Sequence, residues 1–196
     1  MANTNTPFGF RQYSGTGSSP TYEQVAGQTV YNASAIYYGD PVQLDTNGLI
    51  IVGTGSATIA GVYSGCQYLS VAQKRVVWSN YWPGSDVASG NVVTSYYVND
   101  PNAKFVAQTD ATGLTQAGVG ANIGFANAGS AGGNAMSGIS GAYIDVSTLS
   151  SSTTTLPFRV VSLVTQPPGV NGTEAGAYNL AIVAFNSVTT KTLVGI

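Results

Sequence analysis

The chain has 196 residues and a mass of 20.0 kDa, and only 7% of its residues are charged, with no histidine. A soluble protein usually carries about 25% charged residues, so general acid–base catalysis, zinc binding and phosphate binding have few groups here to use. The hydrophobic fraction of 43% includes 12 Tyr, which excludes a disordered chain and indicates a packed core. The net charge of -2 comes without a basic stripe, so we expect no nucleic-acid partner and a surface prone to association.

An extended N-terminal arm is expected over residues 1–20, because its Gly- and Ser-rich second half cannot sustain a helix or a sheet ladder. The arm also carries two aromatic side chains in an otherwise polar segment, which is typical of docking residues. We therefore expect Pro7, Phe8, Phe10 and Arg11 to make contacts, and two alternatives stay open. These residues dock either on a neighbouring subunit or on the core of their own chain.

The sequence after the arm is dominated by β-forming residues, with turn residues about every 8–12 positions, as in a sandwich or barrel. The dipeptide Asn47-Gly48 predicts a type I′ hairpin turn. Strands are expected at Thr29–Tyr31, Ala35–Tyr38, Val42–Asp45, Leu49–Val52, Thr58–Tyr63, Lys74–Trp82, Gly90–Val98 and Lys104–Gln108.

Residues 109–155 differ in composition, because Gly, Ala, Ser, Thr and Asn dominate there. We expect a long loop-rich insertion with short strands at Ile123–Ala126 and Ala142–Val146, and a loop of this length is usually functional or ordered by a partner. The apolar runs Leu156–Val164 and Tyr178–Phe185 predict strands that are buried on both faces.

The fold class expected from this pattern is all-β, an antiparallel β-sandwich or barrel that is jelly-roll-like. It forms one β-rich domain over residues 21–196, preceded by the arm. No apolar stretch reaches the length of about 18 residues that spans a membrane, so we expect no membrane partner.

Reactive constellations are few, and we expect no catalytic, cofactor-binding or metal-binding residues. Cys66 has no partner for a disulfide and its neighbours offer no base, so it is interpreted as a small buried residue. Calcium could be bound by oxygen atoms of Asp40, Asp45 and Asn47, but a strand–turn role explains these residues better. A glycosidase needs only two carboxylates, yet most carboxylates here sit beside turn residues, so the chain is not expected to be an enzyme.

Several phrases along the chain resemble a family of tailed-bacteriophage head cement, or capsid decoration, proteins. They are Asn5–Arg11, Gly39–Val42 with Asn47-Gly48, Gly61–Tyr68, Val98–Phe105 and Leu156–Val161, in this order. The resemblance implies a structural virion protein on the outer surface of the capsid head that clamps neighbouring capsomers. Its implied partners are the major capsid protein and further copies of itself, as a homotrimer or alternatively a dimer.

A second function stays open beside this one. Tyr and Trp side chains on a β-domain can also line a sugar groove, so the alternative is a carbohydrate-binding virion protein from a tail or fibre. A hydrolase that uses an Asp pair is the third and weakest hypothesis.

Overall fold

The computed structural model of the chain describes residues 3–16, 24–165 and 174–191, and its regular structure is almost entirely β-strand. The strands are β1 (Arg11–Ser14), β2 (Val25–Thr29), β3 (Pro41–Leu44), β4 (Ile50–Val52), β5 (Gly61–Ser70), β6 (Arg75–Ser79), β7 (Val93–Val98), β8 (Lys104–Gln108), β9 (Asn122–Ala126), β10 (Tyr143–Ser150), β11 (Phe158–Leu163) and β12 (Leu180–Phe185). Two short 3-10 turns are added, η1 (Gln116–Gly118) and η2 (Gly129–Ala131). None of the helical turns in these residues is long and apolar enough to cross a membrane. The all-β prediction is confirmed.

Sheet A contains six antiparallel strands in the order β1-β8-β12-β11-β9-β10. It curls strongly, because Thr109, just after β8, forms a parallel bridge with Ile144 of β10. The two strands predicted inside residues 109–155 are therefore β9 and β10, and both are integral members of this sheet.

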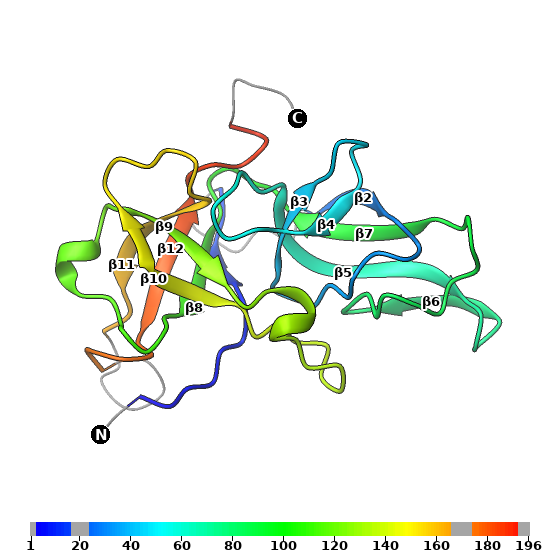
Figure 1. Ribbon diagram of the computed structural model, residues 1–196, viewed down its shortest axis with the longest axis horizontal. Helices are drawn as coiled ribbons and strands as arrows, with labels where there is room; N and C mark the ends of the chain where they lie inside the picture. The colour runs from blue at the N-terminus through cyan, green and yellow to red at the C-terminus, as the bar shows by residue number, and fades with distance from the viewer. Residues whose placement is uncertain (1–2, 17–23, 166–173, 192–196) are drawn as a thin grey trace.

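Sheet B follows the order β2-β7-β5-β3-β4, with β6 paired to the second half of β5. It curls as well, because β2 contacts β4, which lies at the other end of the strand order. Figure 1 shows the two sheets side by side along the long axis, with sheet A in the left half and β6 at the right.

Each sheet covers its own hydrophobic cluster. The cluster under sheet A is rich in Phe, and Phe158 contacts four other rings at centroid distances of 4.5 to 6.3 Å. The cluster under sheet B contains Tyr63, Cys66 and the fully buried Trp82. Strands β5 and β7 contribute to both clusters, because Val62 and Val98 belong to the first one.

The hairpin of β3 and β4 is confirmed, but its type I′ turn is not. Such a turn needs a positive φ at both central residues, whereas only Gly48 has one, with φ of 75°. The carboxylate of Asp45 accepts the backbone N–H groups of Asn47 and Leu49, each at 2.8 Å, and this stabilises a longer turn. The Gly48 N–H also donates to the Asp45 carbonyl at 3.0 Å.

Two strand predictions near the N-terminus are wrong. Strand β2 ends at Thr29, where Thr29–Tyr31 was expected to form a strand, because the chain turns after it with a hydrogen bond from Ala33 N–H to the Val30 carbonyl. The segment Ala35–Tyr38 is not a strand either, since Ile36 and Tyr38 make only isolated bridges.

The prediction that the last two strands are buried on both faces is also wrong. Burial alternates along β11 and β12, because the hydrophobic cluster covers only one face of sheet A. The outward residues of β12 are apolar nevertheless, namely Leu180, Ile182 and Ala184, whereas β11 exposes both Arg159 and Val161. The continuous apolar run of β12 therefore indicates that its outward face is apolar as well, and not that both of its faces are buried.

Candidate functional site

The described part of the N-terminal arm, residues 3–16, lies on its own chain. Phe10 is only 1% exposed and stacks on Phe158 with ring centroids 4.5 Å apart. Upstream, Gln108 accepts the Thr6 N–H at 2.9 Å and donates to the Thr4 carbonyl at 2.8 Å. Of the two alternatives left open for Phe10, the structure has the ring docked on the core of its own chain, where it completes the Phe cluster of sheet A.

The other predicted contact residues of the arm are only half-buried. Pro7 and Phe8 keep part of their surface accessible, and contact of these two with a partner stays a prediction. Arg11 places its guanidinium carbon 4.6 Å from the centre of the Tyr38 ring, a cation–π contact. The last arm residues, 17–20, lie outside the described residues.

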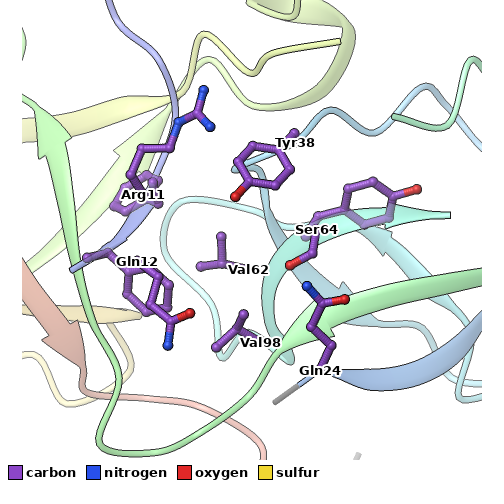
Figure 2. A pocket seen from close by; sticks show the side chains of 10 residues that line it. Arg11, Gln12, Gln24, Tyr38, Val62, Ser64 and Val98 are labelled. Carbon is purple, nitrogen blue, oxygen red and sulfur yellow. The ribbon is translucent and has the colours of Figure 1, made fainter. Parts of the chain in front are cut away.

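A cavity of about 250 Å³ lies between the arm and the two sheets. Figure 2 shows Arg11 and Gln12 on one side, Ser64 and Gln24 on the other, and Val62 with Val98 between them. The remaining lining residues are Phe10, Tyr38, Tyr63 and Phe105. The lining therefore offers one cation, amides and hydroxyls over an apolar floor, and it brings no carboxylate or imidazole that would act as a general base.

The most exposed aromatic surface lies on the outer face of sheet B. We call it the Trp78 surface and define it by Leu69, Val76, Trp78, Val92 and Tyr96. Strand pairing explains why these side chains share one face, since directly paired residues point the same way. Leu69 pairs with Val76, and Gln67 pairs with both Trp78 and Thr94.

Trp78 is the centre of this surface and is 69% exposed. Its ring stacks on Tyr96 with centroids 5.5 Å apart and planes 17° from parallel, and the Tyr96 hydroxyl donates to the Gln67 side chain at 3.3 Å. An exposed aromatic side chain held in place by a second ring is typical of a binding surface, because its contact area is large and its conformational entropy cost is low.

A second exposed apolar surface lies on the outer face of sheet A, and we call it the Tyr13 surface. It is a shallow hollow of about 320 Å³ lined by Tyr13, Val106, Leu163, Val164, Thr165 and Ile182. Tyr13 comes from the arm strand β1 and is 55% exposed. It lies at an irregularity of the pairing between β1 and β8, which shifts between Gln12 and Ser14, and its side chain borders Val106 of β8 and Ile182 of β12.

Most described carboxylates serve turns. Asp45, Asp86, Asp100, Asp110 and Asp145 each accept at least one nearby backbone N–H. The Leu49 N–H lowers the pKa of Asp45, and the Ser70 hydroxyl lowers the pKa of Asp86. Within the described residues, no three His, Cys, Asp or Glu side chains gather where they could hold a metal ion.

Asp40 is the exception, because it is fully buried. Burial raises the pKa of its carboxyl group, although the Ser140 hydroxyl and the Tyr37 N–H, which donate to it at 2.5 and 2.7 Å, act in the opposite direction. The carboxylate joins the start of β3 to the segment after η2 across 100 residues of sequence. Asp40 is buried against Ser140 whereas Asp45 binds the backbone of its own turn, so the structure does not bring the candidate calcium ligands together as a site.

Cys66 is buried within the cluster of sheet B, as expected from the sequence. Burial raises the pKa of its thiol to about 11, so the nucleophilic thiolate is scarce near neutral pH.

The sequence prediction missed Tyr13 and Trp78, which are the most exposed aromatic side chains among the described residues. A signal for Trp78 was present, because the segment Val76-Val77-Trp78 is apolar without alternation. A strand with apolar residues on both faces has to bury both faces or expose one of them. No comparable signal marks Tyr13, which looks like any other residue of a polar arm.

Comparisons of the chain with protein-family models, with curated proteins and with solved structures give no match.

Proposed function

We propose that the chain is a structural virion protein that binds the outside of a phage capsid shell and clamps neighbouring capsomers. The observation that carries the proposal is the pair of exposed apolar surfaces, one on each sheet, in a chain with very little charge. A large exposed apolar patch usually marks an interaction site. Two such surfaces allow one molecule to hold two neighbours, so that weak single contacts add up to a strong joint hold.

The phage resemblance supplies the identity of the neighbours, namely the major capsid protein and further copies of this chain. The Tyr13 surface is the one assigned here to the shell. It includes the arm strand β1, and the half-buried Pro7 and Phe8 precede that strand on the same arm.

Binding of the full chain to shells that lack it tests this assignment. Tyr13→Ser should weaken binding at least about tenfold, because a central aromatic residue of an interface is commonly worth more than about 1.4 kcal/mol. Met136→Ser is the matched control, since Met136 is 100% exposed and belongs to neither surface. Equal binding by both variants would remove the Tyr13 surface from the proposal.

Deleting the arm is a poor substitute for this test, because Phe10 belongs to the core and its loss would destabilise the whole domain. Gold labelling of intact virions is a complementary test of location. Label on the tail and none on the head would refute the decoration function.

A carbohydrate-binding virion protein of a tail or fibre remains the second candidate. The Trp78 surface favours it specifically, because the exposed Trp78 ring lies beside the uncharged Gln67 side chain, and the uncharged Thr94 follows on the next strand. Aromatic faces and side-chain amides and hydroxyls are suited to neutral sugars. Glycan binding that is lost in Trp78→Ser, together with a location off the head, would favour this function over the first.

A further inference from the structure

Strand β6 is an edge strand with unusual exposure. It pairs with β5 along its whole length, without a bulge, and its other edge has no partner strand within the described residues. Proteins normally protect such edges with charges, prolines or bulges. β6 has the sequence Arg-Val-Val-Trp-Ser, so Arg75 is its only charge, and Val76 and Trp78 are both exposed.

We propose that β6 pairs antiparallel with β6 of a second copy of this chain, centred on Val77. In this register Val77 faces Val77 of the second copy, and Trp78 faces Val76 of the second copy. Aromatic and β-branched side chains form favourable cross-strand pairs. The two Trp78 surfaces then join into one apolar face that continues from sheet B of one copy to sheet B of the other.

The choice of a second copy as the occupant rests on charge and symmetry. Within β6 the only charged residue is Arg75, which faces Ser79 of the second copy in this register. The two Arg75 residues are then offset by about 13 Å along the strands, which is four residues at about 3.3 Å each. Two β6 strands can therefore pair in this register without placing like charges directly opposite each other. A strand with a charge at its middle could not do so.

The pairing corresponds to the dimer, not the homotrimer, among the two oligomeric states expected from the resemblance. Its role on the shell rests on the proposed function. Each copy of the pair would offer its Tyr13 surface to a different place on the shell, so two weak shell contacts would act together. The pairing itself is a property of the purified full-length chain, so it is tested without any shell.

Cysteine cross-linking tests the register directly. In Val77→Cys the two introduced Cα atoms are expected about 4.5–5.5 Å apart, within the range that a disulfide spans. Arg75→Cys is the matched control on the same strand, because its two copies would be about 13 Å apart and cannot be bridged. The native Cys66 is buried and does not compete.

After oxidation with diamide, which accepts the two hydrogens released by the thiols, Val77→Cys should run as a covalent dimer and Arg75→Cys as a monomer. Equal cross-linking of both variants would show random collision and overturn the register. The unmodified chain is measured in parallel by sedimentation, and Trp78→Thr should weaken its dimer at least tenfold whereas Met136→Thr should leave it unchanged.

A wild-type chain that stays monomeric up to about 100 μM, where a pair of micromolar affinity is mostly formed, would overturn the pairing. A trimer would overturn it as well, because the proposed contact is two-fold. Neither result bears on shell binding through Tyr13, and loss of shell binding would leave the pairing of purified protein intact. Glycan binding at Trp78 by a monomeric chain would assign the Trp78 surface to a carbohydrate ligand instead of a second copy of the chain.

Discussion

Replacing Phe10 by Ala decides whether the arm is part of the fold. The Phe10 ring is 1% exposed, stacks on Phe158 and meets Phe125 edge to face at 6.0 Å. Removing a buried Phe side chain costs about 3–5 kcal/mol, because both the transfer energy and the cavity count. That is a large fraction of the 5–15 kcal/mol that stabilises an ordinary domain.

The expected result is measurable in urea. With a denaturant dependence of about 2 kcal/mol per M, the midpoint of unfolding should fall by about 1.5–2.5 M. Tyr13→Ala is the matched control, because Tyr13 lies on the same arm and is 55% exposed. Its expected cost is about 0.5 kcal/mol.

The comparison of these two variants distinguishes an arm that is part of the fold from an arm that docks on another subunit. If Phe10 docked on a neighbouring subunit, Phe10→Ala would leave the isolated chain as stable as Tyr13→Ala does. Equal midpoints for the two variants would refute the reasoning that places Phe10 in the core.

Three further predictions concern single sites. Cys66 should react with a thiol reagent such as DTNB only as fast as the chain unfolds, because it is buried and its pKa is raised to about 11; fast labelling of the native protein would contradict this. The stability of the wild type relative to Asp40→Asn should rise as the pH falls from 7 towards 4, because burial raises the pKa of Asp40 and the folded state gains a proton first; a constant difference across pH would exclude that cause. Gly55→Ala should lower the free energy of unfolding by about 1–3 kcal/mol, because the added Cβ would overlap the Phe125 carbonyl oxygen. An unchanged denaturation midpoint would argue against this close approach.

Much of the strand pattern was predictable, because local sequence carries it. Lys104–Gln108 was predicted with the bounds of β8, and Ile123–Ala126 differs from β9 by one residue. Both are short runs of β-formers bounded by turn residues, where propensity and tertiary pairing agree. Segment Ala35–Tyr38 has a similar β propensity, but the strand predicted there is wrong. A strand also needs a neighbour that pairs with it along its length, and Ile36 and Tyr38 make only isolated bridges.

The candidate surfaces were much less predictable. Whether an apolar side chain points inward depends on the register and on which faces other layers cover, and neither is local in sequence. Val161 and Val160 are chemically identical neighbours in β11, yet the first is exposed and the second is buried. Likewise, Phe10 and Tyr13 are both aromatic residues of one arm, and only the pairing of β1 with β8 separates core from surface.

Strands β5 and β7 belong to both hydrophobic clusters, and this has a mechanical consequence. Val62 and Tyr63 are adjacent in β5 but lie in different clusters, and so do Val98 and Tyr97 in β7. Neither half can melt without breaking strands that the other half needs, so the molecule should denature as one cooperative unit. A pull applied to one sheet is therefore expected to pass through the continuous backbone of β5 and β7 to the other sheet.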